Sequence, residues 1–211
     1  MIFKRFLKKK ELKGGWPALH KLPKVETLID IGIGHQGTEG LYKYFPNSRK
    51  VFVDPLEECK EAVQHHLLDS KNIFHTFALG RKHSEVEIFV RHPISRSGIV
   101  EKVTPEDFVE KRKIEMYTLD EVIGLESIKN SVGIKIDAEG YELEIIKGAK
   151  KTLEIADFII LELPISEPRF KNSYSFYEAL TFMHEKSFGV SSIRVSGDGS
   201  DHCDVAFIKN K

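Results

Sequence analysis

The chain has 211 residues, which is enough for one hydrophobic core and predicts a single domain. Its 32 basic and 32 acidic side chains give a formal net charge of zero, so the charge does not favour a nucleic acid as partner. No apolar run approaches the roughly 18 residues of a membrane span, and we expect neither a transmembrane segment nor a signal peptide. Cys59 and Cys203 match no metal or redox spacing, which predicts buried thiols and a cytoplasmic location.

The first residues form a basic segment over 1–15, in which cations alternate with Phe3, Phe6 and Leu7. A solvated or frayed terminus is the simpler interpretation of this pattern. The alternative is a weak contact with an anionic membrane surface. The remaining residues, 16–211, are expected to form the single folded domain.

The first predicted strand, over 27–31, runs into a glycine-rich turn. Gly32, Gly34 and Gly37 have the spacing G-x-G-x-x-G, and Asp54 follows Gly34 at about the 20-residue distance expected for an acid that binds a ribose. This pattern is typical of nucleotide binding at the end of a parallel strand. It leaves a nicotinamide or flavin enzyme open, as well as a turn without a ligand.

One acid in this strand narrows the choice of cofactor. Asp30 interrupts an apolar strand two residues before Gly32, and a buried carboxylate is costly unless it is paired. An acid here suits a ligand with an amino group or a sulfonium, whereas it repels a pyrophosphate. The pattern therefore favours S-adenosylmethionine over NAD.

The next part of the chain alternates helical and extended patterns, as in a parallel α/β sheet. Pro46 ends the first predicted helix, and Pro55 suits the first turn of the second. The segment over 102–113 is mostly polar and is expected to be an irregular excursion. The predicted elements are a helix over 37–45, a strand over 51–54, a helix over 55–68, a strand over 73–78, a hairpin-like region over 85–90, a short strand over 117–119 and a helical turn over 120–125.

The second half continues this alternation. The predicted elements are a strand over 132–137, a helix over 141–153, a strand over 158–163, a helix over 173–187 capped by Ser173, and strands over 190–195 and 204–208. The loop between the last two strands is too short for a crossover helix, so these strands must be antiparallel. We therefore predict an α/β, Rossmann-like class I methyltransferase fold: a mostly parallel seven-stranded sheet with a C-terminal antiparallel hairpin and helices on both faces.

A second motif follows the strand over 132–137. Asp137 and Glu139 come directly after it, where ligands bind in open α/β sheets, so both should face a reacting centre. Taken alone, this segment also fits a structural turn, because acids suit the N-terminus of a helix.

In these motifs the chain resembles the FkbM family of S-adenosylmethionine-dependent O-methyltransferases. The residues that carry the resemblance are Asp30-Ile31-Gly32-Ile33-Gly34, Asp54-Pro55, Thr118-Leu119-Asp120, Lys135 through Ala149, and Ile160-Leu161-Glu162. Two departures concern the cofactor contacts. Asp54 stands where the family usually has Glu, and Ile33 with His35-Gln36 occupies the first turn in place of an Ala-Asn pair.

The resemblance implies S-adenosylmethionine as cofactor. The residues expected to bind it are Asp30, Gly32 and Gly34 at the methionine end, Asp54 at the ribose, and Ala78 and Leu79 beside the adenine, together with His35 and Pro55. The reaction is expected to be in-line attack of an acceptor oxygen on the sulfonium methyl group.

We expect Asp137 or Glu139 to lie nearest the acceptor hydroxyl, with His202 or His35 as competing bases. A divalent ion on Asp137, Glu139 and Glu162 is the alternative, and no required metal is the expectation.

The resemblance points to a small-molecule or glycan acceptor: a hydroxyl on a sugar, a polysaccharide or a secondary metabolite. Plausible acceptor-side loops lie at 95–98, 102–113 and 166–174. The sequence leaves two other functions open, an NAD(P)-dependent oxidoreductase and a non-catalytic binding subunit with a methyltransferase fold. It predicts no oligomeric state.

Overall fold

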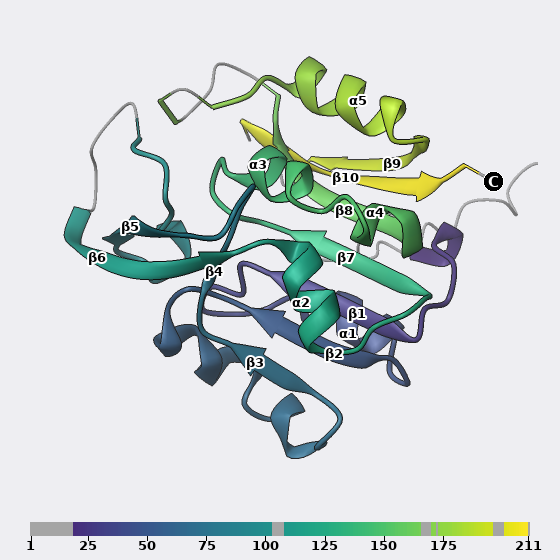
Figure 1. The fold of residues 1–211 in the computed structure, drawn as a ribbon, viewed down its shortest axis with the longest axis horizontal. Coiled ribbons are helices and arrows are strands. Elements are labelled where there is room, and N and C mark those ends of the chain that lie inside the picture. The colour runs from purple at the N-terminus through teal and green to yellow at the C-terminus, as the bar shows by residue number, and fades with distance from the viewer. Residues whose placement is uncertain (1–18, 103–107, 166–169, 172, 196–200, 211) are drawn as a thin grey trace, which may run out of the picture.

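A computed structural model describes residues 19–102, 108–165, 170–171, 173–195 and 201–210 of the chain. Its main feature is a seven-stranded sheet (Figure 1). The strands are, in spatial order, β3 (Ile73–His75), β2 (Arg49–Val53), β1 (Thr27–Ile31), β7 (Val132–Ile136), β8 (Ala156–Pro164), β10 (His202–Lys209) and β9 (Phe188–Val195). The first five strands in this spatial order, β3, β2, β1, β7 and β8, are parallel, and β10 is antiparallel to both β8 and β9.

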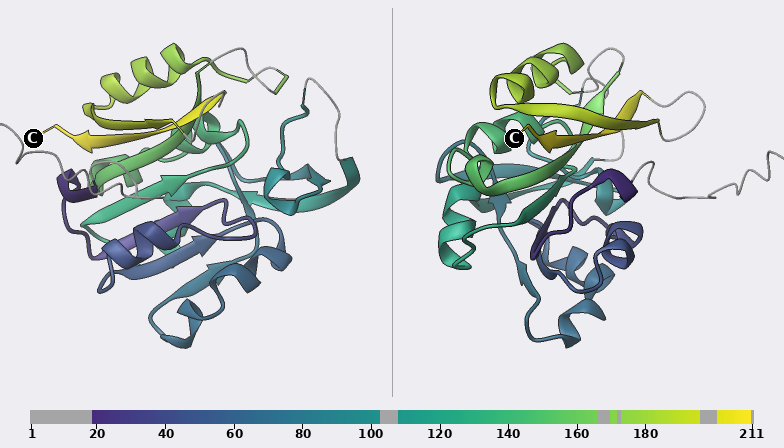
Figure 2. Two further views of the ribbon diagram at one scale, coloured as in Figure 1. Left: turned by 180° about the vertical axis from the view of Figure 1, so that it is seen from behind. Right: turned by 90° about the vertical axis from the view of Figure 1, so that its right-hand side faces the viewer.

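Helices cover both faces of this sheet (Figure 2). One face carries α2 (Leu119–Leu125), α3 (Glu142–Lys147), α4 (Thr152–Ile155) and α5 (Phe176–Glu185). The other carries α1 (Glu39–Tyr44) and the 3₁₀ helices η1 (Leu19–Lys21), η2 (Glu57–Val63) and η3 (His66–Leu68). Strand β1 is buried throughout, with Leu28 in one core and Ile29 in the other. These observations confirm the predicted fold class.

A second, three-stranded sheet is the main difference from the prediction. It consists of β4 (Ala78–Leu79), β6 (Phe108–Tyr117) and β5 (Ser84–Arg91), and the short 3₁₀ helix η4 (Ile94–Arg96) follows β5. The predicted strand over 73–78 is therefore confirmed only over its first three residues, because β3 ends at His75 and β4 belongs to the other sheet. The predicted excursion over 102–113 is wrong from residue 108 onward, where the chain forms β6.

The predicted helix over 55–68 is replaced by η2 and η3, which are tightened into 3₁₀ turns. At its start, the Leu56 N–H donates to Asp54 Oδ1 (2.9 Å). Near its end, the rings of His65 and His66 both contact Glu39 Oε1. Consecutive residues of an α-helix point in different directions, so this shared contact is incompatible with a regular helix.

Two later helices also differ from the prediction. The helix over 141–153 breaks into α3 and α4 at Gly148, where a Cβ atom would lie 2.2 Å from the Gly80 carbonyl oxygen. The last helix begins after Ser175, not at Ser173. The Ser175 hydroxyl accepts from the Glu178 N–H (3.2 Å), and Glu178 Oε2 accepts from the Ser175 N–H (2.7 Å), which is a capping box.

Cys59 and Cys203 are buried free thiols, as predicted. Within the described ranges, no helix combines the length and the apolar character needed to cross a membrane. The basic segment over 1–15 lies outside the described residues, so its two interpretations stay predictions.

Candidate functional site

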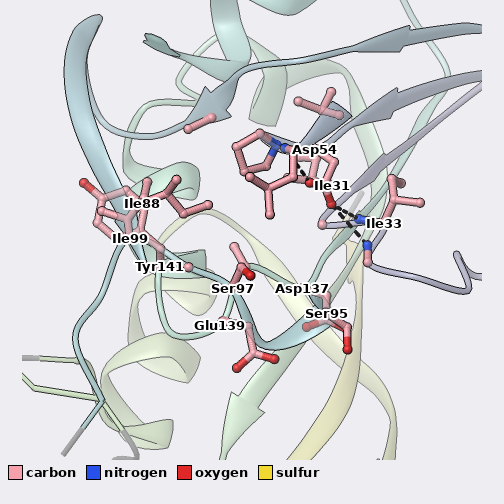
Figure 3. A pocket seen from close by; sticks show the side chains of 18 of the residues that line it. Ile31, Ile33, Asp54, Ile88, Ser95, Ser97, Ile99, Asp137, Glu139 and Tyr141 are labelled. Atoms are coloured by element: carbon pink, nitrogen blue, oxygen red, sulfur yellow. Dashed lines mark hydrogen bonds between the residues drawn. The ribbon is translucent and has the colours of Figure 1, made fainter. Parts of the chain in front are cut away.

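A cavity of about 500 Å³ opens at the carboxyl ends of the parallel strands, where the strand order reverses between β1 and β7 (Figure 3). Residues at the ends of β1, β2, β7 and β8 form its floor. The second sheet and the loop after β5 supply the facing wall, which includes Ile88, Ser95, Ser97 and Ile99. The volume is within the range of small-molecule sites.

The glycine turn after β1 forms one side of the cavity. Gly32 has a φ of 80°, and a Cβ atom there would lie 1.7 Å from the Asp137 carbonyl oxygen. Gly34 has a φ of 56°, and its Cβ would lie 2.9 Å from the Cβ of Ser95. Glycine favours this left-handed backbone, and it permits the close approach of Gly32 to the loop after β7 and of Gly34 to η4.

Asp54 holds this turn in place. Its Oδ2 accepts from the N–H groups of Ile33 (2.9 Å) and Gly34 (3.1 Å), as the dashed lines in Figure 3 show. Burial raises the pKa of Asp54, and these backbone hydrogen bonds oppose that rise. The aspartate therefore binds the turn directly, and it also lines the cavity.

Asp30 is the one predicted cofactor residue that does not line the cavity. It is almost fully buried, and its Oδ2 accepts a hydrogen bond from the Tyr42 hydroxyl. Burial raises its pKa to about 6, although the positive charge of Lys135 opposes the rise. The structure thus places Asp30 in contact with Tyr42 of α1, and its contact with a cofactor stays a prediction.

Acidic side chains gather at the ends of β7, β8 and β10. Asp137 Oδ2 lies 3.1 Å from Lys135 Nζ, and Asp204 Oδ1 lies 3.8 Å from the same nitrogen. Burial alone lowers the pKa of Lys135, but the surrounding carboxylates outweigh it and the net pKa is raised. A buried, charged lysine therefore partly neutralises this end of the cavity.

Glu162 and His202 form a pair in the same region. His202 Nε2 lies 3.1 Å from Glu162 Oε1, and His202 Nδ1 lies 2.8 Å from Asp201 Oδ1. Burial and the negative charge of Asp137 raise the pKa of Glu162 well above its usual range. From sequence, Glu162 is the acid that ends a strand of the family motif and an alternative metal ligand, and the structure places it in the cavity wall.

A buried glutamate positions the loop from Asp137 to Gly140. Glu142 Oε1 accepts from the Ala138 N–H (2.7 Å) and the Gly140 N–H (3.3 Å), and Tyr174 donates to Oε2 (2.5 Å). These contacts hold Glu139 at a φ of 50°, a conformation that non-glycine residues rarely adopt. The sequence analysis missed this role, because no local pattern distinguishes buried Glu142 from the other acids of this helix.

The remaining wall is apolar and is formed by Phe77, Ala78 and Leu79 together with Ile88, Ile94 and Ile99. Ten of the predicted site residues line the cavity: Gly32, Gly34, His35, Asp54, Pro55, Ala78, Leu79, Asp137, Glu139 and His202. The three acids of the alternative metal site do not form a compact set. In the part of the chain that the structure describes, the only three potential ligands within 4.8 Å of one another are Glu39, His65 and His66.

Comparison with known proteins identifies a family. Residues 26–190 match the family described as methyltransferase FkbM domain. A search of curated proteins found no match.

Among solved structures, the pyocyanin biosynthetic protein PhzM is 11% identical, with a TM-score of 0.45; the match covers 89% of this chain and 51% of PhzM. This chain thus spans about half the length of PhzM. Magnesium protoporphyrin IX methyltransferase from Synechocystis PCC 6803, solved with bound SAM, is 11% identical (TM-score 0.48), with 90% of this chain and 73% of that chain covered. TrmK from M. capricolum, solved with S-adenosyl-homocysteine, is 11% identical (TM-score 0.49), and the match covers 88% of this chain and 62% of TrmK. At these scores the likenesses carry no conclusion about activity.

Proposed function

Because the chain belongs to the FkbM methyltransferase family, we propose that it transfers a methyl group from S-adenosylmethionine to a hydroxyl of a sugar, polysaccharide or secondary metabolite. The observation that carries this proposal is the cavity at the switch point of the sheet, with a glycine turn on one side and acids at the strand ends.

The residues of the cavity fit this cofactor. The apolar wall of Phe77, Ala78 and Leu79 suits an adenine ring, and Asp54 lies where an acid can accept from ribose hydroxyls. At the other end, Asp137 and Glu139 create a negative potential that suits an amino group and a sulfonium. The same potential repels a pyrophosphate, which disfavours NAD.

The bound cofactor supplies an electrophilic methyl group, so the protein mainly aligns the acceptor and removes its proton. We propose that Glu162 is the base that accepts the proton of the acceptor hydroxyl, because a carboxylate with a raised pKa is a stronger base than an ordinary one. His202 orients Glu162 through their 3.1 Å contact. Asp137 and Glu139 face the same space, with Asp137 bound to Lys135.

The test uses S-adenosylmethionine with a labelled methyl group and a panel of hydroxylated sugars. We expect O-methylated product with the wild type and a loss of about 100-fold or more in turnover with Glu162→Gln, because general bases contribute by that order. Affinity for S-adenosylhomocysteine should stay unchanged. Glu154→Gln, an exposed acid on α4 that does not line the cavity, is the matched control and should keep full turnover.

The pH dependence adds a second readout. The wild-type rate should rise with pH as Glu162 loses its proton, at a pH above the usual carboxyl range because its folded pKa is raised. The Gln variant should lack this rise. Full turnover in Glu162→Gln with an unchanged pH profile would remove Glu162 from the mechanism, and the absence of any methylated product would count against the proposed function.

A further inference from the structure

Three side chains with metal-binding atoms meet outside the cavity, on the α1 face of the sheet. Glu39 is the first residue of α1, His65 lies between η2 and η3, and His66 is the first residue of η3. Glu39 Oε1 lies 2.9 Å from His65 Nε2 and 2.7 Å from His66 Nε2. All three potential ligand atoms lie within 4.8 Å of one another. We propose that Glu39, His65 and His66 bind a divalent transition-metal ion of the Zn²⁺ type.

The donor set favours this class of ion. Two imidazole nitrogens and one carboxylate oxygen are ligands that Zn²⁺ takes in proteins, whereas Mg²⁺ prefers oxygen alone. The present contacts are short enough that the three side chains need only small shifts to surround one ion. The side chain of His65 is 59% exposed and that of Glu39 is 34% exposed, so water can reach the site and complete the coordination.

The more buried ligand is already oriented by its surroundings. The His66 ring lies edge-on to Tyr42, with 4.9 Å between ring centroids, and it packs 6.0 Å from Phe52. The His65 ring lies beside the His66 ring, tilted by 40°, with 4.0 Å between the ring centroids. Two adjacent histidines that converge on one carboxylate oxygen are unusual, because consecutive residues of a regular helix diverge. The 3₁₀ turns of this segment are what make the convergence possible.

The location points to a structural effect. Glu39 follows the glycine turn by two residues, and the segment that carries the histidines begins just after Asp54 and Pro55. A bound ion would therefore tie together the two segments that flank one side of the cavity. None of its three ligands lines that cavity, so the ion would stabilise the fold and would not take part in methyl transfer.

Binding to the full-length protein can be measured after exhaustive chelation and removal of the chelator. We expect calorimetric titration with ZnCl₂ to show one site on the wild type, with a Tm that rises with Zn²⁺ concentration, and titration with MgCl₂ to show none. Glu39→Gln and His65→Ala should each weaken binding at this site at least tenfold. Both positions are partly exposed, so neither change should prevent folding, which circular dichroism will verify.

His184→Ala is the matched control, because His184 is an exposed histidine on α5, on the opposite face of the sheet. It should bind Zn²⁺ like the wild type. A wild-type protein that binds no Zn²⁺ would overturn the proposal. So would Glu39→Gln and His65→Ala variants that bind Zn²⁺ with wild-type affinity and show the same rise in Tm.

Discussion

At the scale of single residues, Asp30 connects the strand that ends in the glycine turn to the helix that follows it. Its carboxylate is buried at the centre of the sheet, with Tyr42 of α1 as its hydrogen-bond donor. Lys135 on the neighbouring strand faces it in register and lowers its pKa, but burial has the larger effect. Because the pKa of this carboxyl is higher in the folded protein than in the unfolded chain, the stability of the protein depends on pH.

The sign of this dependence follows from the two pKa values. Burial raises the pKa of Asp30 from 3.8 to about 6, so the folded protein binds a proton that the unfolded chain releases. The free energy of unfolding should fall as pH rises from about 3 to about 7, by about 3 kcal/mol from this group, and stay level above that.

Asp30→Asn removes the titration but keeps the shape of the side chain. Urea denaturation of both proteins at pH 4 and pH 7 isolates the effect, because other groups contribute equally to both. The difference in unfolding free energy between variant and wild type should shift by about 2 kcal/mol in favour of the variant between pH 4 and pH 7. Parallel pH curves would show that Asp30 keeps an ordinary pKa.

At this scale the sequence predicts positions better than contacts. The spacing of Gly32 and Gly34, and the strand-end positions of Asp54 and Asp137, are local properties, and the structure places all four at the cavity. The partners of Asp30 and Glu142 depend on Tyr42 and Tyr174, which lie 12 and 32 residues away. No local pattern encodes such pairs.

At the scale of elements, the capping box of α5 gives a direct test of where this helix begins. Ser175→Ala should lower the free energy of unfolding by about 1 kcal/mol, because it leaves the Glu178 N–H without its acceptor. Ser175→Asp should restore most of the stability, since aspartate is an equally good N-cap residue. Thermal and urea denaturation of both variants measure this. Equal stability of Ser175→Ala and the wild type would contradict the assigned cap.

Strand β6 shows why some elements escape prediction from sequence. Most of its residues are exposed, so it lacks the alternation of apolar and polar residues that marks a half-buried strand. Charged cross-strand pairs accompany its pairing with β5, namely Lys113 with Glu85 (2.9 Å) and Lys111 with Glu87 (3.3 Å). In the sequence, a strand rich in such charged residues looks like a polar loop. The fully buried strands β1 and β7, in contrast, are mostly apolar, with one charged residue each (Asp30 and Lys135), and sequence analysis locates them well.

At the scale of the whole molecule, the cavity exists because two sheets meet. The main sheet supplies the glycine turn and the acids, which the order of the predicted strands already brings to one edge. The second sheet places Ile88 and the loop of Ser95 and Ser97 over that edge. The sequence predicts the first half of this arrangement. It does not predict the second, because β5 and β6 pair across a connection with no distinctive pattern.

The measurement that tests the central claim most directly is calorimetric titration of the protein with S-adenosylhomocysteine, with NADH in parallel. The wild type should bind S-adenosylhomocysteine and not NADH. Gly32→Ala should lose at least tenfold in affinity, because its Cβ would collide with the Asp137 carbonyl oxygen. Gly124→Ala, where a Cβ atom meets nothing within 4 Å, should bind like the wild type. Binding of NADH alone, or unchanged affinity in Gly32→Ala, would contradict the account of this cavity.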